Sequence, residues 1–481
     1  MSEIREECGV FGIYSPKKEN LSQIVYFGLF SLQHRGQESC GIAVNNEGIF
    51  SSYKDLGLVN DVITPSVIDK LGEGNIAVGH VRYGTTGGNE RSNAQPIVVN
   101  HIKGSMALAH NGNLINSYEL RSEFEAKGSI FHTTSDTEVI AHTIIEERLK
   151  ADTIEEAVCE AMNRIKGAYS MVIMSPQKLI AARDKNGFRP LCYGKTANGE
   201  YVVASESCSL DSVGAEFIRD IEKGEIVVFG KDGITSIKKH CNKSKQTLCV
   251  FEYIYFARPD SIIDGKNVYE ARIKAGEILA KENPVNADIV VGVPDSGLDA
   301  ALGYSKASGI PYGIGLIKNK YIGRTFIHPE VKSRMDRVKI KLNPMANVVK
   351  GKRVILIDDS IVRGTTSGRI VKLLREAGAI KVHMRVSAPP FVNPCYYGID
   401  IDSKDNLIAC KYTIEEIAKK IGADTLGYLS LEGVKKIGYV NEKSGFCIAC
   451  FDGNYPTKIP TEKFKNRFER KINNIDEEKS K

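Results

Sequence analysis

Short runs of apolar residues that alternate with polar ones dominate the first half of the chain. Runs rich in Val, Ile and Tyr, bounded by Gly, Asn or a charged residue, predict β-strands. They cover residues 76–81, 96–100, 106–110, 169–174, 178–182, 201–204 and 225–229. Two helical segments are predicted among them, one that opens at Ser135 and one over residues 153–165. We therefore predict two sheets sandwiched between helices.

The pattern changes after the polar run at residues 238–247, which is the best candidate for a linker. Predicted strands and helices then alternate: a helix over 268–281, a strand over 288–293, a helix after Gly297, a strand over 353–357, a helix over 367–377 and a strand over 381–386. Such alternation predicts a parallel sheet with crossover helices. The charged residues from Lys458 onward predict a surface helix that frays into a tail.

Composition narrows the classes of protein that fit this pattern. The chain has 481 residues, of which 42% are hydrophobic and 26% charged, so a disordered or fibrous protein is excluded and about two domains are expected. Lys and Arg exceed Asp and Glu by 65 − 59 = 6, too small an excess to indicate a nucleic-acid binder by itself. No apolar run is long enough to span a bilayer, and the N-terminus lacks the basic start of a secretion signal. We expect a cytoplasmic protein whose eleven cysteines are reduced.

An apolar strand followed by a turn of small residues is the sharpest local signal. The strand ends in the adjacent carboxylates of Asp358 and Asp359, which suit sugar hydroxyls or a divalent cation. Ligands bind at the carboxyl ends of parallel strands, and a turn rich in Gly and hydroxyl groups that opens a helix makes a phosphate site. The turn consists of Arg363, Gly364, Thr365, Thr366 and Ser367. The alternative is an ordinary helix start with both acids solvated.

A second strand and a basic segment support a phosphate site. The strand at 288–293 ends in a Pro-Asp-Ser-Gly turn that contains Ser296. Residues 318–341 hold eight Lys or Arg and two acids, a net charge of 8 − 2 = +6. This segment, which includes Lys320, predicts a mobile basic lid over a polyanion, with a nucleic-acid surface as the alternative. The whole pattern resembles type I phosphoribosyltransferases, whose substrate-covering loop matches the basic segment.

Cys8 lies at the start of the first β run, after only seven residues. A cysteine whose own α-amino group is free has a base beside its thiol, because an α-amine with a pKa of ~7.7–8.0 can take the thiol proton near neutral pH. That chemistry requires removal of residues 1–7. The alternative is a buried core cysteine that follows a frayed start.

Four further motifs follow Cys8 in order: LQHRGQES at 32–39, RYGT at 82–85, HNGN at 110–113 and SDTE at 135–138. Together they resemble the glutaminase domain of N-terminal-nucleophile (class II) amidotransferases. The resemblance implies the following site: Cys8 as nucleophile, the Asn111 side chain and the Gly112 N–H as oxyanion donors, Arg82 on the substrate carboxylate, Asp136 on its ammonium, and Arg35 with Gly36 shaping the glutamine pocket.

A class II glutaminase joined to a phosphoribosyltransferase resembles the glutamine phosphoribosylpyrophosphate (PRPP) amidotransferases, here from Cys8 to about Tyr455. The implied fold class is α/β (α+β): an N-terminal αββα glutaminase sandwich followed by a parallel-sheet α/β domain of the type I phosphoribosyltransferases. The motif at residues 251–261 lies at the domain junction. The implied boundaries are a propeptide at 1–7, the glutaminase at 8–240, the phosphoribosyltransferase at 248–455 and a tail at 456–481.

The resemblance also implies a two-step reaction. Cys8 releases ammonia from glutamine through a thioester, and the ammonia displaces pyrophosphate at C1 of PRPP to give 5-phosphoribosylamine, the step that opens purine nucleotide synthesis. A dry passage must join the two sites, since ammonia in neutral water is protonated. The implied ligands of Mg²⁺ are Ser296, Asp358 and Asp359, and the implied PRPP-binding residues are Asp358, Asp359, Arg363, Gly364, Thr365, Thr366, Ser367 and Lys320. Feedback inhibition by purine nucleotides and a homotetramer are implied as well.

Four cysteines stand apart from the rest: Cys249, Cys395, Cys447 and Cys450. The last two form a C-x-x-C pair, which alone fits redox pairs, zinc sites and chance. Four thiolates suit structural zinc or an iron–sulfur cluster equally by count. These are the positions at which the Bacillus-like branch of the family ligates a [4Fe-4S] cluster. The other cysteines away from the N-terminus, at 40, 159, 192, 208, 241 and 410, are predicted to be small core residues.

Two other classes of protein share part of this pattern. A regulator could use the PRPP pocket as a sensor, but it would need a DNA-reading element, which the sequence lacks, and would have no use for a glutaminase. A class II amidotransferase that makes an amino sugar would lack the Asp358–Ser367 pattern. We therefore expect small-molecule partners only, with neither nucleic acid nor membrane among them.

Overall fold

The computed structural model describes residues 8–84, 88, 90–320, 342–401, 403–438 and 445–460, which form two compact units. The first unit consists of residues 8–248, Tyr396–Ile399 and residues 456–460. The second consists of Cys249–Cys395 and Asp400–Tyr455. The expected propeptide at 1–7, residues 321–341 of the expected lid and residues 461–481 of the expected tail lie outside the described residues.

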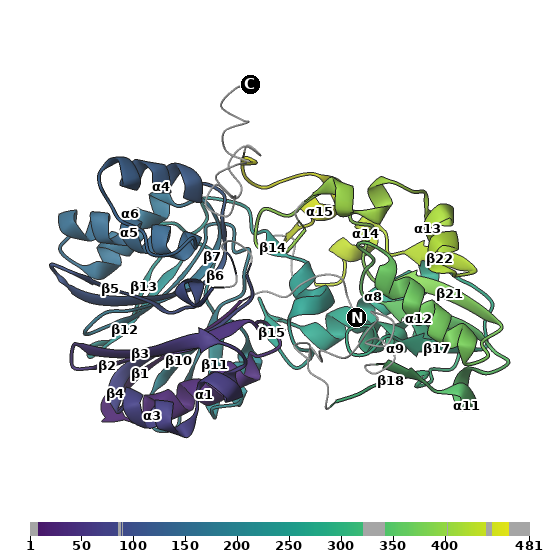
Figure 1. The fold of residues 1–481 in the computed structure, drawn as a ribbon, viewed down its shortest axis with the longest axis horizontal. Helices are drawn as coiled ribbons and strands as arrows, with labels where there is room; N and C mark the ends of the chain where they lie inside the picture. Colours follow the sequence, from purple (N-terminus) through teal and green to yellow (C-terminus); the bar gives the residue numbers. More distant parts are fainter. Residues whose placement is uncertain are drawn as a thin grey trace. The chain divides into compact units, whose positions relative to one another are not determined.

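Two antiparallel sheets form the middle of the first unit (Figure 1). The seven-stranded sheet has the order β11 (Ala215–Asp220), β9 (Cys192–Thr196), β10 (Tyr201–Ala204), β1 (Gly9–Glu19), β4 (Gly74–Arg82), β2 (Ser39–Asn46) and β3 (Ile49–Leu56). The six-stranded sheet has the order β13 (Gly233–Ile237), β12 (Ile226–Gly230), β8 (Leu179–Arg183), β7 (Gly167–Met174), β6 (Gly104–Leu114) and β5 (Ile97–His101). Val10, Ile76, Val172 and Val227 of the facing strands share one buried apolar cluster, so the sheets pack face to face.

Helices cover both outer faces of this sandwich. Leu21, Val25 and Leu29 of α1 pack on the outer face of the seven-stranded sheet. That layer consists of α1 (Leu21–Ser31), α2 (Val59–Val62), α3 (Pro65–Leu71) and α7 (Ser207–Asp211). The layer on the six-stranded sheet consists of α4 (Ser117–Ala126), α5 (Asp136–Lys150) and α6 (Ile154–Arg164), and a 3₁₀ turn lies at Arg91–Asn93. The predicted arrangement of two sheets between helices is confirmed.

The predicted number of helical segments in this unit was too small. α5 and α6 coincide with the two predicted segments, but α1 and α4 were not predicted. α1 contains Ile24, Val25 and five Tyr, Phe or Leu residues with polar residues only near its ends, so its sequence lacks the polar stripe that marks a surface helix. Its helical state depends on packing against the sheet, which local propensity does not report.

The second unit is built on a four-stranded parallel sheet with the order β17 (Ile289–Gly292), β20 (Arg353–Asp358), β21 (Lys381–Val386) and β22 (Thr425–Tyr428). Its helices are α8 (Val268–Glu282), α9 (Leu298–Ser308), α11 (Ala346–Val349), α12 (Thr365–Glu376), α13 (Ile414–Ile421), α14 (Leu431–Lys435) and α15 (Ala449–Asp452). The predicted parallel sheet with crossover helices is confirmed, because β17, β20 and β21 are the three predicted strands.

Short strands and turns complete the second unit. They form the pairs β14 (Leu248–Cys249) with β23 (Phe446–Cys447), β15 (Ile262–Ile263) with β16 (Lys266–Asn267), and β18 (Leu316–Lys318) with β19 (Leu342–Pro344). Short 3₁₀ turns lie at Lys404–Asn406 and Ile408–Cys410. The junction motif forms a π-helical turn, Glu252–Phe256, which Arg272 holds by donating hydrogen bonds to the carbonyls of Tyr253, Tyr255 and Ala257. Within the part of the chain that is described, no helix is both long and apolar enough to cross a membrane.

Candidate functional site

Cys8 lies at the start of β1, and its side chain is buried with 6% exposure. The Cys8 thiol donates to the carbonyl of Tyr83 at 3.4 Å, and the Arg35 Nε donates to the Cys8 carbonyl at 3.0 Å. Since β1 pairs with β4 in the register Gly9 to Val81, the end of β4 lies beside the cysteine. Both the backbone and the sulfur of Cys8 are therefore held by groups from other strands and loops.

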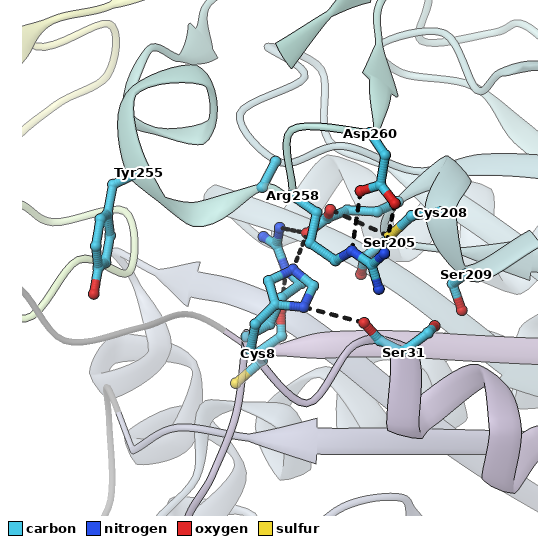
Figure 2. A network of polar contacts seen from close by, with 12 residues as sticks. Cys8, Ser31, Ser205, Cys208, Ser209, Tyr255, Arg258 and Asp260 are labelled. Atoms are coloured by element: carbon cyan, nitrogen blue, oxygen red, sulfur yellow. Dashed lines mark hydrogen bonds and ion pairs between the residues drawn. The ribbon is translucent and has the colours of Figure 1, made fainter. Parts of the chain in front are cut away.

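A buried ion pair anchors Cys8. The Arg35 Nη1 lies 2.6 Å from the Glu206 Oε1, and both side chains are 0% exposed. His34 adds a second contact to Glu206, at 2.8 Å from its Nε2, while its Nδ1 lies 3.1 Å from the Ser31 carbonyl. Figure 2 shows this network, with Cys8 and Ser31 labelled, together with Cys208, whose thiol donates to the Glu206 Oε2 at 3.6 Å. Arg35, which was predicted to shape the glutamine pocket, contacts the backbone of the cysteine and a buried acid.

Arg82 ends β4 and is buried, with 2% exposure. Its Nη1 donates to the Gly88 carbonyl at 3.5 Å, and its own carbonyl accepts from the Glu38 N–H at 3.1 Å. Gly36 packs so closely on this strand end that a Cβ there would lie 2.6 Å from the Arg82 nitrogen. The motifs at 32–39 and 82–85 therefore meet where Gly36 packs on Arg82, and only glycine leaves room for this contact.

Asn111 and Gly112 lie on β6, opposite Ser170 and Tyr169 of β7. Gly112 has a φ of +142°, and a Cβ there would lie 2.1 Å from the Ala168 carbonyl oxygen, so only glycine fits. The Asn111 side chain is 1% exposed, and its Nδ2 has no hydrogen-bond partner among the described residues. An unpartnered buried donor costs free energy, so its retention points to a ligand that accepts from it.

Two buried histidines and Asp136 surround this strand. The His80 Nε2 lies 3.0 Å from the His110 carbonyl, which joins β4 to β6 next to Arg82 and Asn111. Burial lowers the pKa of His110, so its ring is neutral at neutral pH. The Asp136 Oδ2 accepts from the Leu114 N–H at 2.9 Å, and its Oδ1 lies 3.8 Å from the His110 Nδ1. Asp136 is the first residue of α5, a favourable position for a carboxylate.

The second site lies at the carboxyl end of β20. Asp358 and Asp359 are 2% and 0% exposed, and burial together with the neighbouring Asp359 raises the pKa of Asp358 well above its usual value. The Ser296 hydroxyl donates to the Asp359 Oδ1 at 2.5 Å. A Cβ at Gly297 would lie 2.4 Å from the Ile357 carbonyl oxygen, so the turn after β17 packs directly on the end of β20. Such a set of oxygen atoms is the donor chemistry that Mg²⁺ takes in proteins.

The small-residue turn leads from β20 into α12. Gly364 caps the helix with a φ of +79°, a conformation that glycine adopts at little cost. Ser367 is buried, Thr366 is half-buried, and Arg363 and Thr365 are exposed. The exposed residues and the helix N-terminus therefore offer hydroxyl groups and backbone dipoles to an anion.

The described start of the basic segment lies close to the turn after β17. Lys318, at the end of β18, forms an ion pair with Asp295 of that turn. Lys320 is exposed. The rest of the predicted lid, from residue 321 to 341, lies outside the described residues.

The four cysteines that stand apart in the sequence meet in the second unit. Burial raises the pKa of the Cys450 thiol well above its usual value, and the thiols of Cys395, Cys249 and Cys447 raise it further. Phe251, Phe391 and Phe451, each within four residues of one of these cysteines in the sequence, pack on one another with ring centroids 4.9–6.5 Å apart. Among the described residues, no group of three or more His, Cys, Asp or Glu side chains is arranged so that it could hold a metal ion.

The remaining cysteines follow the core prediction in part. Cys40, Cys159, Cys192 and Cys208 are buried. The prediction was wrong for Cys410, which is exposed, and Cys241 is only half-buried. Neither lies in an α-helix or a strand. Cys410 ends a short 3₁₀ turn, and Cys241 lies in the turns between β13 and β14.

Sequence reasoning did not find Glu206 or the segment Tyr396–Ile399. Glu206 comes before a short helix in a Ser-rich run, which resembles any helix start. The Tyr-Tyr-Gly sequence at 396–398 resembles an ordinary turn. Neither carries a local signal, because each acquires its importance from contacts with residues far away along the chain.

Two family profiles match the chain. The profile of a glutamine amidotransferase domain matches residues 82–212, and that of a phosphoribosyl transferase domain matches residues 261–417. The sandwich with Cys8 at its first strand and the parallel sheet with paired acids at a strand end agree with these two matches. Fold and site define a glutamine amidotransferase joined to a phosphoribosyltransferase domain.

Curated relatives identify the family within this class. The amidophosphoribosyltransferase of Methanocaldococcus jannaschii is 49% identical over 96% of this chain and 100% of its own length, and that of Bacillus subtilis is 49% identical over 95% of each chain. This chain belongs to the amidophosphoribosyltransferase family. The solved structure of the B. subtilis PRPP amidotransferase with ADP and GMP has a TM-score of 0.87, with 47% identity and coverage of 95% of this chain and 98% of that chain. A structure described as the allosteric regulatory enzyme of purine biosynthesis has a TM-score of 0.89, with 47% identity and coverage of 97% and 100%.

The anchor beneath Cys8 yields a testable prediction. In Glu206→Gln the buried Arg35 cation loses its counter-charge, so the free energy of unfolding should fall by about 3 kcal/mol. Because Arg35 then holds the Cys8 carbonyl less firmly, glutamine-dependent turnover should fall by about a hundredfold. Urea denaturation and glutaminase assays measure the two effects.

A matched control removes the same charge from an exposed pair. Glu222 contacts Lys238, with half of each side chain exposed. Glu222→Gln should change the free energy of unfolding by less than about 1 kcal/mol and leave turnover unchanged. Equal effects of the two variants would contradict the anchoring role of Glu206.

Proposed function

We propose that this amidophosphoribosyltransferase hydrolyses glutamine at Cys8 and transfers the ammonia to PRPP at the end of β20, which yields 5-phosphoribosylamine, glutamate and pyrophosphate. This reaction opens purine nucleotide synthesis. The unpartnered Asn111 amide beside Gly112 carries the glutaminase part, since nothing else among the described residues explains a buried donor there. The buried acids at the end of β20 support the transferase part. Release of pyrophosphate from PRPP in the presence of glutamine tests the whole reaction.

Cys8 is the nucleophile once residues 1–7 have been removed. Its freed α-amine takes the thiol proton, and the thiolate attacks the carbon of the glutamine amide. The Arg35 contact to the Cys8 carbonyl supports this role, because a new N-terminal residue has no preceding chain to hold it. The α-ammonium returns a proton to the leaving nitrogen, so ammonia departs and a thioester remains. Water then releases glutamate.

The oxyanion of the tetrahedral intermediate accepts hydrogen bonds from the Asn111 Nδ2 and the Gly112 N–H. Each such donor is typically worth ~2.7–4 kcal/mol of the activation barrier. The β6–β7 pairing supports this role, because it fixes the peptide at Gly112 in a conformation that only glycine can adopt. Both donors are in place before the charge develops, so no reorganisation is needed in the transition state.

Glutamine is held at its α-carboxylate by Arg82 and at its α-ammonium by Asp136. The planar guanidinium can form two parallel hydrogen bonds with a carboxylate. Asp136 keeps one oxygen on the Leu114 N–H, which orients the other for the ammonium. The Asn93 side chain lies between the two. It donates to the Gly88 carbonyl, which also accepts from Arg82, and to Thr134, two residues before Asp136.

PRPP is held at the carboxyl end of β20 by Asp358, Asp359 and the turn Arg363–Ser367, with Lys320 from the basic segment. The helix N-terminus and hydroxyls receive the 5-phosphate, while the acids hold ribose hydroxyls and, with Ser296, Mg²⁺. Mg²⁺ would neutralise the diphosphate charge as pyrophosphate leaves C1. Ammonia must reach C1 without meeting bulk water, because ammonium has no lone pair with which to attack.

Cys249, Cys395, Cys447 and Cys450 would hold a [4Fe-4S] cluster. The resemblance to the Bacillus-like branch favours the cluster, and the effect of the other three thiols on Cys450 supports their proximity. Its role is structural, since the reacting groups are elsewhere.

Further properties of the relatives extend to this chain as part of the proposal. The B. subtilis structure contains ADP and GMP, so we expect purine nucleotides to act as feedback inhibitors. We expect a homotetramer in the cytoplasm, with small molecules as the other partners. Sedimentation velocity with and without GMP tests the assembly and its response to nucleotide.

Cys8→Ala should abolish glutamine-dependent synthesis, because the thiol that forms the thioester is missing. Synthesis from added ammonium salts should stay within about twofold of the wild type, since that step needs only the second site. Pyrophosphate release with each nitrogen source measures both activities. Mass spectrometry of the active wild-type protein should find Cys8 at the N-terminus. Loss of both activities in Cys8→Ala would contradict two separate sites.

Asp358→Asn combined with Asp359→Asn should reduce synthesis from either nitrogen source by at least about a hundredfold, since both the ribose hydroxyls and Mg²⁺ lose their ligands. The exchange keeps the side-chain shapes, so the first unit should keep its glutaminase activity. Exposed Asp405→Asn serves as the control and should change neither activity. Unchanged synthesis in the double variant would remove these acids from the site.

Cys450→Ser should lower the iron and acid-labile sulfide of anaerobically purified protein from about four of each per chain to well below one. The broad visible absorption of the cluster should disappear with them. Cys410→Ser is the matched control and should keep full iron content, because Cys410 is exposed and is not among the thiols that act on Cys450. About one zinc ion per wild-type chain, with little iron, would contradict the cluster.

A further inference from the structure

The segment Tyr396–Ile399 belongs to the first unit, although the residues on both sides of it belong to the second. We propose that this segment positions the oxyanion strand of the glutaminase, so that a part of the chain far downstream of the glutaminase domain sets the rate of glutamine hydrolysis. The inference rests on the glutaminase function proposed above. It assigns a positioning role to Tyr396 and Tyr397, which contact neither Cys8 nor the oxyanion donors in the interactions described.

The first contact of the segment is with β6. The Asn113 Nδ2 donates to the Tyr396 carbonyl at 3.0 Å, and Asn113 follows the oxyanion residue Gly112 directly. Gly398 has a φ of +119°, and a Cβ there would lie 3.6 Å from the Gly112 carbonyl carbon and 3.0 Å from the Arg189 Nη2. The segment therefore lies against the backbone of the oxyanion strand, and the positive φ at Gly398 favours glycine there.

The second contact is with the loop between β8 and β9. The ring of Phe188 stacks on that of Tyr397, with centroids 4.2 Å apart and an interplanar angle of 19°. The Arg189 Nη2 donates to the Tyr397 carbonyl at 2.6 Å. Phe188 and Arg189 are 0% exposed and Tyr397 is 3% exposed. A buried stack and a charge-assisted hydrogen bond fix the segment firmly.

The same loop is tied to the strand that pairs with the oxyanion residues. The Ser170 hydroxyl donates to the Arg189 carbonyl at 3.2 Å, and Ser170 pairs with Asn111 across β6 and β7. The Asp184 carboxylate accepts from the N–H of Tyr169, which pairs with Gly112, and from the N–H groups of Gly187 and Phe188. Contacts thus run from Tyr397 through this loop to both oxyanion residues.

The far end of the Tyr397 side chain is also held. Its hydroxyl lies 2.7 Å from the Thr457 Oγ1 and accepts from the Thr457 N–H at 3.2 Å. Where the segment begins and ends, the Cys395 N–H donates to the Ile401 carbonyl at 2.9 Å and closes the loop. The segment is therefore a fixed support for β6, since it is held by Asn113, by the loop with Phe188 and Arg189, and by Thr457.

Support of β6 by this segment should affect the stability of the transition state more than the binding of glutamine. Glutamine is held by Arg82 and Asp136, which the segment does not contact in the interactions described. The oxyanion exists only after Cys8 attacks, so a small displacement of Asn111 and Gly112 lowers kcat while KM stays nearly constant. A general loss of structure would instead lower both activities of the enzyme.

Tyr397→Ala tests the proposal in the enzyme that has lost residues 1–7 and keeps the rest of its chain. Tyr397→Phe is the conservative variant. Tyr397→Ala should lower kcat for glutamine hydrolysis by about tenfold, with KM within about twofold and ammonia-dependent synthesis unchanged. Tyr397→Phe keeps the stack on Phe188 and should restore kcat to within about twofold of the wild type. Inhibition constants for the aldehyde analogue of glutamine, which forms a tetrahedral adduct with a thiolate, should rise about tenfold, while those for glutamate should not.

A rise in KM that matches the fall in kcat, or an unchanged kcat, would overturn the proposal. So would equal weakening of the aldehyde and of glutamate. Should Tyr397→Ala fail to fold, Asn113→Ala decides in its place, because it removes the contact between β6 and the Tyr396 carbonyl without changing the segment itself. Failure of the proposed function is distinguishable, since then Cys8→Ala itself would keep glutaminase activity.

Discussion

The first unit depends on a buried ion pair that contacts the backbone of Cys8, the proposed nucleophile. Arg35 donates a hydrogen bond to the Cys8 carbonyl, and Glu206 forms an ion pair with Arg35 in which neither side chain is exposed to water. A buried cation without its counter-charge is strongly destabilising, so Glu206 and Arg35 must be brought together whenever the domain folds. In the proposed function Cys8 is the first residue of the processed chain, and this pair then supplies the positional restraint that a preceding peptide would give. The position of the Cys8 backbone, and with it that of the thiol, depends on this contact.

The two proposed sites use the backbone in different ways. In the first unit, antiparallel pairing of β6 and β7 fixes Asn111 and Gly112, and the site consists of donors aimed at a charge that does not yet exist. In the second unit, the end of a parallel strand presents Asp358 and Asp359, and Gly297 lets the neighbouring turn bring Ser296 to them. In the proposed function the first arrangement stabilises a transient oxyanion, and the second holds a stable polyanion with its cation. The peptide bond from Cys395 to Tyr396 joins a proposed cluster ligand to the segment that supports the first site.

Much of the fold follows from local patterns. The strands at 201–204 and 381–386 agree with β10 and β21 residue for residue, because runs of branched residues between turns signal strands strongly. α1 escaped prediction since its apolar residues occupy nearly every face, and only its packing on the sheet makes it a helix. The phosphate turn was readable because its acids, glycine and hydroxyl residues are contiguous. The glutaminase site was readable only as a family resemblance, since its motifs are separated by tens of residues along the chain.

By itself the sequence determined the alternation of strands and helices, the composition of the turn after β20 and the presence of a cysteine that processing could expose, because each depends on neighbouring residues. Tertiary structure alone decided that Glu206 lies beneath Cys8, that the Asn111 amide is left without a partner among the described residues, and that Tyr396–Ile399 belongs to the first unit. These features arise from contacts between residues up to 283 positions apart. Such contacts form only when whole sheets and helices pack together, and no local pattern of residues encodes them.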